Sequence, residues 1–102
     1  MPGLVSIAIR AYRRQWLPDA IASVLGQTHQ HLELVVFDDA GTLEDVATRS
    51  GDVRVRYHRP SSRLPAGGRF REAVALCSGD YIGVLDDDDR YLPDHLETLV
   101  SF

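Results

Sequence analysis

The amino-acid sequence predicts an α/β fold, with a mostly parallel sheet and helices on both of its faces. Short apolar segments of strand length alternate along the chain with segments whose apolar residues repeat at helical spacing. Clusters of charged residues directly follow three of the predicted strands, and parallel α/β sheets bind ligands at the carboxyl ends of their strands. With 102 residues, 44% of them hydrophobic, the chain has the size of one small domain.

The first predicted strand and helix lie near the amino terminus. Residues 4–9 are apolar with small residues interleaved, which is typical of a strand buried on both faces. Pro18 suits the first turn of a helix, and Gly26 ends it. The apolar residues of this helix repeat at helical spacing: Leu17, Ile21, Val24 and Leu25.

The second predicted strand, residues 32–37, is followed at once by two carboxylates. These are Asp38 and Asp39, and the turn former Gly41 comes after them. Asp38 is expected to cap this turn, so Asp39 is the better candidate for binding a ligand. Thr42 is placed to cap a short helix that runs to about residue 49. The residues of this helix expected to face the core are Leu43, Val46 and Ala47.

The third predicted strand alternates apolar residues with arginines, which predicts one solvated face and an edge position. Its apolar residues are Val53, Val55 and Tyr57. Residues 59–68 contain two prolines, two serines and two glycines, which indicates a loop. A helix follows, with a core-facing stripe at helical spacing: Phe70, Ala73, Val74 and Cys77. Cys77 is therefore expected to act as a small buried hydrophobic residue.

The fourth predicted strand, residues 81–85, is short and apolar, and it is expected to be buried. A final helix is expected to start near Pro93. Its apolar residues are Leu92, Leu96, Leu99 and Val100.

Four consecutive carboxylates follow the fourth strand: Asp86, Asp87, Asp88 and Asp89. Repulsion among them favours a bound cation, and hard oxygen ligands favour Mg²⁺ or Mn²⁺, although a solvated acidic turn would show the same run. The run does not fit an EF-hand loop, because Arg90 and Tyr91 stand at its fifth and sixth positions. Two other polar clusters, residues 10–14 and 38–39, follow predicted strands and would meet the run at one edge, which favours a metal site.

Composition excludes several classes of protein. Four of the 15 acidic residues lie in the run after the fourth strand, so the other 11 balance the 11 basic residues, and no basic excess indicates a nucleic-acid binder. All basic residues are arginine, so any phosphate-binding cation of the chain is a guanidinium. The single cysteine predicts a reducing compartment, and no apolar run reaches the length of a membrane span. We expect a cytoplasmic location, at the inner face of a membrane in a longer protein.

Four segments in order resemble the nucleotide-binding half of family 2 glycosyltransferases, which have a Rossmann-like GT-A fold. These segments are residues 5–7 leading to Ala11 and Tyr12, residues 20–28 (AIASVLGQT), residues 32–39 (LELVVFDD), and residues 79–82 (GDYI) through Leu92 and Pro93. The resemblance covers nearly the whole chain. It implies that residues 1–102 are a single, partial GT-A domain that binds a nucleotide-diphosphate sugar.

The resemblance also implies roles for individual residues. Asp39 would contact the nucleotide base, Tyr12 would pack near it, and Asp86 would face the ribose. Asp88 and Asp86 would hold a divalent metal, Mn²⁺ or Mg²⁺, through a DxD motif that starts at Asp86. The substrate-binding set implied is Ala11, Tyr12, Asp39, Asp86, Asp87 and Asp88. The donor would be a UDP-sugar, transferred with inversion to a sugar, lipid or polysaccharide acceptor.

The chain departs from the usual family pattern at two places and in its length. It has Arg10-Ala11-Tyr12-Arg13 where the family usually has a Pro-Thr/Ala-Tyr-Asn turn, and Arg69-Phe70-Arg71 where Ala-Arg-Asn is usual. The general base and the acceptor site of the family would lie beyond Phe102, so no catalytic base is expected within the chain. We therefore expect an unpaired sheet edge and possible self-association. Two alternatives stay open: a non-catalytic nucleotide-sugar-binding or assembly fragment, and a phosphoacceptor receiver-like domain, which the absence of lysine disfavours.

Overall fold

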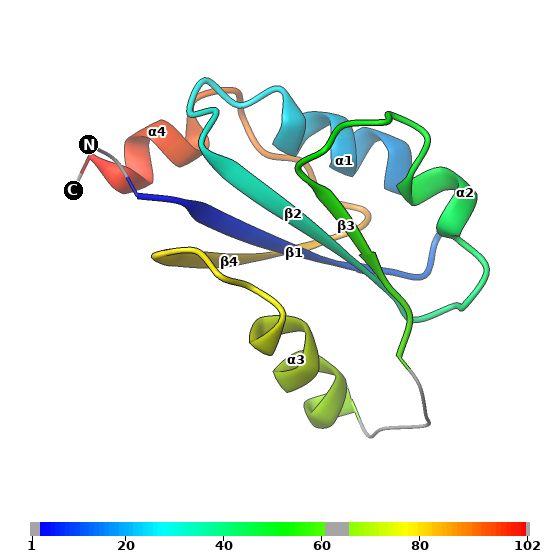
Figure 1. Ribbon diagram of the computed structural model, residues 1–102. Helices are drawn as coiled ribbons and strands as arrows, with labels where there is room; N and C mark the ends of the chain where they lie inside the picture. The colour runs from blue at the N-terminus through cyan, green and yellow to red at the C-terminus, as the bar shows by residue number, and fades with distance from the viewer. Residues whose placement is uncertain (1–2, 61–65, 102) are drawn as a thin grey trace.

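The computed structural model describes residues 3–60 and 66–101 and, within them, contains one four-stranded sheet (Figure 1). Every neighbouring pair of strands is parallel, and the strand order is β3-β2-β1-β4. The strands are β1 (Val5–Ala11), β2 (Leu32–Asp38), β3 (Val55–His58) and β4 (Tyr81–Asp86). β1 and β2 are buried almost throughout, as their apolar sequences predict.

Helices cover both faces of the sheet. They are α1 (Leu17–Leu25), α2 (Glu44–Ala47), α3 (Ala66–Ala75) and α4 (His95–Val100). Figure 1 shows α1, α2 and α4 along one face and α3 on the other. The chain moves in one direction across the sheet through α1 and α2, then returns through α3 to place β4 beside β1. Crossovers of a single hand require this change of face when the direction reverses. The predicted α/β fold with a parallel sheet is therefore confirmed.

The two faces differ in how much apolar surface they bury. On the α1 side, the strands and the helices α1, α2 and α4 contribute side chains to the larger core, which includes Ile7, Ile9, Leu17, Leu34 and Leu96. On the α3 side, the buried cluster within the described residues is small: Ala8, Phe37 and Ala73, with Leu76 and Cys77 packed against it. Cys77 is partly buried, and this burial is the first cause that raises the pKa of its thiol.

The register of the sheet brings the carboxyl ends of three strands together. Ala11 pairs with Asp38 of β2, and Arg10 pairs with Asp86 of β4. Successive side chains of a strand point to opposite faces. Because Leu85 lies in the α1-side core, Asp86 belongs to the α3 side and Asp87 to the α1 side.

Four details differ from the sequence-based expectations. β4 is mostly exposed: Tyr81, Ile82 and Val84 are 46%, 47% and 39% exposed, because β1 is its only neighbour among the strands of the described residues. Val53 is exposed and lies outside β3. Helix α3 includes residues 66–68, which were expected to be loop. Residues 61–65 of that expected loop and the side chain of Phe70 lie outside the described part of the structure.

The fourth difference concerns helix starts. The turn before α2 is not capped by Thr42, because the first helical residue follows Leu43 and the cap position makes no side-chain hydrogen bond. α4 begins at His95, two residues later than Pro93, and it leaves Leu92 exposed. Leu43, Val46 and Ala47 are buried as predicted. No helix among the described residues is long and apolar enough to cross a membrane.

Candidate functional site

Three loops meet at the carboxyl ends of the strands, beside the point where the strand order reverses. The chain leaves β1 toward β2, and it later returns to the opposite side of β1 as β4. In parallel α/β sheets, the crevice at such a reversal is the usual place of ligand binding. The loops after β1, β2 and β4 contribute the charged groups predicted from the sequence, and the structure places them on two different faces of the sheet.

Asp38, at the end of β2, is a structural carboxylate. Its side chain is buried on the α1 side, 1% exposed, and accepts three hydrogen bonds. The backbone N–H of Gly41 donates to it at 2.7 Å, that of Leu43 at 2.8 Å, and the hydroxyl of Tyr57 at 2.6 Å. Burial, together with this bond to Asp38, raises the pKa of Tyr57 to about 12. The turn needs Gly41 because its φ is +78°, and Asp38 caps it as the sequence predicts.

Asp39 lies on the opposite face, next to Arg10. Its backbone N–H donates to the carbonyl of Ala11 at 2.8 Å, which fixes the loop after β2 to the end of β1. A guanidinium nitrogen of Arg10 lies 3.7 Å from a carboxylate oxygen of Asp39. Within the described part of the chain, the Nε of Arg10 is buried without a hydrogen-bond partner. A polar donor and a carboxylate therefore lie side by side at this end of the sheet.

Asp87, in the loop after β4, is also a structural carboxylate. It is 0% exposed, and one of its oxygens accepts the backbone N–H groups of Tyr12 and Arg13 at 2.8 and 2.6 Å. Its other oxygen accepts the Nε of Arg13 at 3.0 Å and lies 2.9 Å from Nη2. The loop after β1 is thus fastened to the loop after β4 by four contacts on one side chain.

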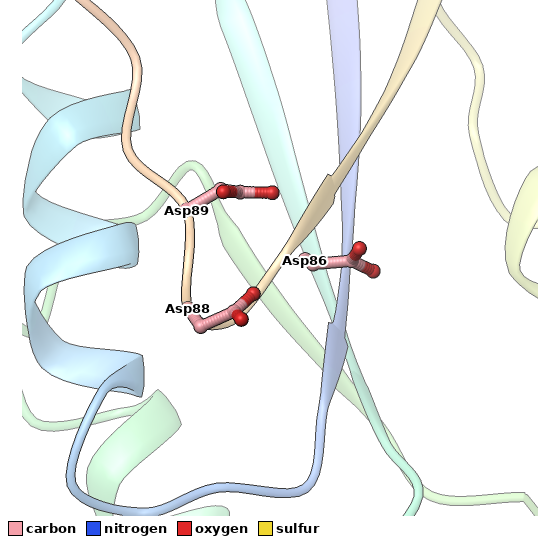
Figure 2. Close-up of side chains that lie close together, drawn as sticks. All are labelled: Asp86, Asp88 and Asp89. Carbon is pink, nitrogen blue, oxygen red and sulfur yellow. The ribbon is translucent and has the colours of Figure 1, made fainter.

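The remaining carboxylates of the acidic run are exposed and close together. One oxygen each of Asp86, Asp88 and Asp89 can be chosen such that all three lie within 4.8 Å of one another. Figure 2 shows Asp86 at the end of β4 and the other two on the loop that follows. The loop folds back because the backbone N–H of Asp89 donates to the carbonyl of Asp86 at 3.0 Å. Three hard oxygen ligands at this spacing suit a divalent cation such as Mg²⁺ or Mn²⁺.

Arg13 connects the buried and the exposed carboxylates. Its Nη1 lies 3.1 Å from an oxygen of Asp88, while its other nitrogens contact Asp87. The guanidinium carbon also lies 4.4 Å from the centre of the Tyr12 ring. Partial burial alone would lower the pKa of Arg13, but the charge and hydrogen bonds of Asp87, with the charge of Asp88, raise it. Arg13 is therefore a permanent positive charge within the acidic run.

The sequence-based site residues thus divide into two groups. In the first group, Tyr12 is half exposed, and Asp86 and Asp88 are exposed at the same edge. In the second group, Ala11 is buried, and its carbonyl accepts the backbone N–H of Asp39. Asp87 is brought to this edge as well, but beneath its surface. Sequence reasoning placed residues 10–14 and the run 86–89 at this edge, but it gave no individual role to Arg13 and did not name Asp89 as a metal ligand. The signal for Asp87 was present, because it lies two residues after the buried Leu85 and so continues the buried face of β4.

Two hollows are relevant to ligand binding. A small one of about 40 Å³ lies beside the acidic run and is lined by Trp16, Asp19 and residues 87–90. A larger one of about 850 Å³ is lined by residues 28–31, Tyr81, Glu97 and the end of α4. Tyr81 is the first residue of β4, so the larger hollow lies at the amino ends of the strands, away from the carboxylates. The larger hollow therefore lies at the amino ends of the strands, whereas the cluster of carboxylates lies at their carboxyl ends.

Comparison with known proteins gives a family match over nearly the whole chain. The model of the family described as glycosyl transferase family 2 matches residues 6–102. An uncharacterised glycosyltransferase of Rickettsia felis is 35% identical over 103 residues, which are 96% of this chain and 17% of that protein. An uncharacterised glycosyltransferase of Haemophilus influenzae is 32% identical over 105 residues, 97% of this chain and 42% of that protein. The chain spans less than half the length of these relatives.

Solved structures show the same fold at low sequence identity. The crystal structure of S. aureus TarS in complex with UDP-GlcNAc matches 96% of this chain and 30% of its own, with a TM-score of 0.77 and 18% identity. The mannosyltransferase PcManGT from Pyrobaculum calidifontis, in complex with GDP-Man and Mn²⁺, matches 88% of this chain and 28% of its own, with a TM-score of 0.71 and 17% identity.

Proposed function

This chain belongs to glycosyl transferase family 2, and we propose that it forms the donor-binding half of a glycosyltransferase domain. The donor is a nucleotide-diphosphate sugar, which binds at the carboxyl ends of β1, β2 and β4. The observation that carries the proposal is the cluster of Asp86, Asp88 and Asp89 at the carboxyl end of β4, beside the reversal of strand order. The position of these residues is the one at which this class of sheet binds ligands.

Asp86 and Asp88 are proposed to hold a divalent cation, Mn²⁺ or Mg²⁺. The donor set fits such an ion, because carboxylate oxygens from separate residues lie within 4.8 Å of one another and all belong to exposed side chains. Asp89 belongs to the same group, so it is a candidate third ligand. PcManGT, which shares the fold, was solved with Mn²⁺. When bound, the cation would stabilise the negative charge that develops on the diphosphate leaving group.

The nucleotide is proposed to lie across the ends of β1 and β2. Asp39 would accept a hydrogen bond from the base, Tyr12 would pack against it, and Ala11 would line this position through its backbone. Asp86 would face the ribose. UDP is the first nucleotide to test, because TarS was solved with UDP-GlcNAc. Because PcManGT was solved with GDP-Man, guanosine diphosphate is the necessary comparison.

Asp87 is proposed to act on the substrate indirectly. It is predicted as a member of the substrate-binding set, yet its carboxylate is buried and receives two backbone N–H groups and the guanidinium of Arg13. Its role would be to fix the backbone of Tyr12 so that the Tyr12 ring can pack against the nucleotide base. An indirect role of this kind predicts weaker nucleotide binding together with lower stability when Asp87 is replaced.

We assign no general base for transfer with inversion to Asp94 or Glu97, the two carboxylates that follow the acidic run. A base must come within hydrogen-bond reach of the acceptor hydroxyl. Asp94 is exposed in the turn before α4, and Glu97 accepts a hydrogen bond from the hydroxyl of Thr28 and lines the larger hollow. Among the described residues we therefore propose donor binding rather than the complete reaction.

The phosphoacceptor alternative is disfavoured by the surroundings of Asp38. A phosphoacceptor carboxylate must expose an oxygen to the incoming phosphoryl group. Both oxygens of Asp38 accept hydrogen bonds from the turn or from Tyr57, and the side chain is buried. A role in capping the turn accounts for all of these contacts.

The proposal predicts that metal and nucleotide bind cooperatively. The diphosphate would complete the coordination shell of the cation, and the cation would screen the carboxylates from the diphosphate. Isothermal titration calorimetry of UDP with and without Mn²⁺ measures this coupling. Asp88→Asn should abolish most of the Mn²⁺ dependence and should weaken it more than Asp89→Asn does. Asp94→Asn, which makes the same change of charge outside the cluster, should leave it intact. Equal UDP affinity with and without Mn²⁺ would contradict the proposal.

A transfer assay separates donor binding from catalysis. With simple sugar or lipid acceptors present, the 102-residue chain should bind the donor without metal-dependent transfer. Transfer that is lost in Asp88→Asn would contradict this expectation and would require a base from a second copy of the chain or from a residue assigned here to another role.

A further inference from the structure

Arg13 contacts two carboxylates of opposite character, and this arrangement points to a role in ligand binding. We propose that Arg13 is a cationic latch: without metal its Nη1 pairs with Asp88, and when a divalent cation takes Asp88 the freed Nη1 donates to the diphosphate. The inference rests on the proposed function, because it assigns a positioning residue to the same site. It makes Arg13 both a competitor of the metal and a partner of the nucleotide.

One end of the latch is fixed. The Nε and Nη2 of Arg13 contact one oxygen of Asp87 at 3.0 and 2.9 Å, and the backbone N–H of Arg13 donates to the other oxygen at 2.6 Å. Asp87 is fully buried. A buried carboxylate loses its partners only at a large cost, so this end of the guanidinium stays in place when a ligand binds.

At the other end of the latch, the ion pair between Nη1 and Asp88 can break. Nη1 is the nitrogen that contacts Asp88, at 3.1 Å, and this carboxylate is 43% exposed. An exposed ion pair of this kind weakens the binding of a competitor by no more than about five-fold, because solvent screens it. A divalent cation carries twice the charge and can take further oxygens from Asp86 and Asp89, so it displaces Nη1 from Asp88.

Displacement leaves a positive charge beside the cation. The planar guanidinium presents nitrogens on two edges, so Nε and Nη2 can keep their contacts with Asp87 while Nη1, in the same plane, donates to another anion. An anion that completes the shell of a cation on Asp88 would be next to that nitrogen. A guanidinium is also the one kind of basic side chain that this sequence offers to a phosphate group.

The two halves of this role predict effects of opposite sign. Removing the guanidinium should strengthen the binding of Mn²⁺ alone, by about two- to five-fold, because a competitor for Asp88 is lost. The same change should weaken the binding of UDP at saturating Mn²⁺, because a cationic partner of the diphosphate is lost. A purely structural role for Arg13 would weaken both, and pure competition would strengthen both.

The test uses Arg13→Gln, with Arg14→Gln as the matched control. Arg14 is the next residue and pairs with Asp45 and the carbonyl of Thr42, apart from the acidic run. Calorimetry measures Mn²⁺ alone, then UDP and inorganic pyrophosphate at saturating Mn²⁺. The latch predicts tighter Mn²⁺ binding and weaker UDP and pyrophosphate binding in Arg13→Gln, with Arg14→Gln like the wild type. Changes of the same sign for metal and nucleotide, or no change, would overturn the latch.

Two further results keep the test decisive. Failure of the wild-type chain to bind Mn²⁺ would contradict the proposed function itself, whereas Mn²⁺ binding without the opposite-sign effect contradicts the latch alone. If Arg13→Gln does not fold, ¹⁵N NMR of the wild type during a Mg²⁺ titration replaces it. The latch predicts that the Nε–H of Arg13 stays protected from exchange while its Nη1 group, released from Asp88, begins to rotate freely. An Nη1 group that remains immobile at saturating Mg²⁺ would overturn it.

Discussion

At the carboxyl edge of the sheet, the two faces use neighbouring carboxylates in opposite ways. On the α1 side, Asp38 and Asp87 are buried and accept hydrogen bonds from the loops that they hold. On the other side, Asp86 is exposed, and Asp39 lies beside Arg10. The carboxylates on the α1 side therefore hold the loops, whereas on the other face Asp86 is exposed and the Asp39 side chain, beside Arg10, is 8% exposed.

The difference follows from the period of a strand. Side chains alternate between the faces, and the alternation continues for one residue beyond the ends of β2 and β4. The α1 side carries the larger core, so a carboxylate that points there must be satisfied by protein donors. A pair of aspartates at the end of a buried strand thus contains one structural member and one functional candidate, and burial of the preceding residues distinguishes them.

The largest expected effect separates Asp87 from Asp86. Asp87→Ala should lower the free energy of unfolding by about 3 kcal/mol or more, because it leaves two backbone N–H groups and a guanidinium without their buried acceptor. Asp86→Ala should change it by about 0.5 kcal/mol or less, since the side chain is exposed. Urea unfolding followed by circular dichroism measures both. Similar losses in the two variants would break the distinction between the faces.

A smaller effect is expected for the hydroxyl that supports Asp38. Tyr57→Phe removes the 2.6 Å hydrogen bond to this buried carboxylate and should cost about 1–2 kcal/mol of stability. Tyr12→Phe is the control, because the ring of Tyr12 is half exposed and its contact with Arg13 is through the ring face. If Tyr12→Phe lost as much stability as Tyr57→Phe, the hydrogen bond from Tyr57 to Asp38 would not explain the loss.

The same pair predicts a change of stability at high pH. The pKa of Tyr57 is about 12 in the folded chain, above the value of about 10 for an unfolded tyrosine. Because the folded-state pKa is raised, the stabilisation is complete below about pH 10 and is lost as the pH rises to about 12. Ultraviolet titration should show one fewer late-ionising tyrosine in Tyr57→Phe than in the wild type, with Tyr91, whose pKa burial also raises, still ionising late in both. A Tyr57 that ionises with the exposed tyrosines would contradict this assignment.

The smallest effect concerns the α3-side face of β4, where Ile82 and Val84 are exposed beside an unpaired strand edge. Such an edge is prone to pairing with another chain, so the 102-residue chain should associate with itself at high concentration. Ile82→Lys should reduce the association, and Thr48→Lys, on the exposed surface of the C-cap of α2, should not. Sedimentation velocity measures both. A wild-type chain that remains monomeric at the highest concentration would contradict the expectation.

Most of the fold could be predicted because its signals are local. The α1 helix follows from apolar spacing with a proline at its start and Gly26 at its end, and β1 and β2 follow from apolar runs of strand length. The edge position of β3 follows from its alternating arginines. The meeting of the acidic segments at one edge follows from the parallel arrangement alone, and this edge is where the candidate site lies.

The remaining features depend on partners that are distant in the sequence. β4 is apolar on both faces, which predicts burial, but burial also requires neighbouring elements, and within residues 3–60 and 66–101 only β1 pairs with it. The hydrogen bond between Asp87 and Arg13 joins residues 74 positions apart, so the sequence around either residue does not predict it. Thr42 is a good cap by residue type, but Asp38 already takes the N–H of Leu43. The glycines at 67 and 68 favour a loop, yet the backbone there is helical.

The most direct test of the account is to locate bound Mn²⁺ by its paramagnetic broadening of backbone amide signals, with UDP present. The strongest broadening should fall on residues 86–89 and extend to Tyr12 and Asp39. Residues 28–31, which line the larger hollow at the amino ends of the strands, should keep sharp signals. Broadening centred on residues 28–31, with sharp signals for Asp86 and Asp88, would contradict the assignment of the donor site to the carboxyl edge of the sheet.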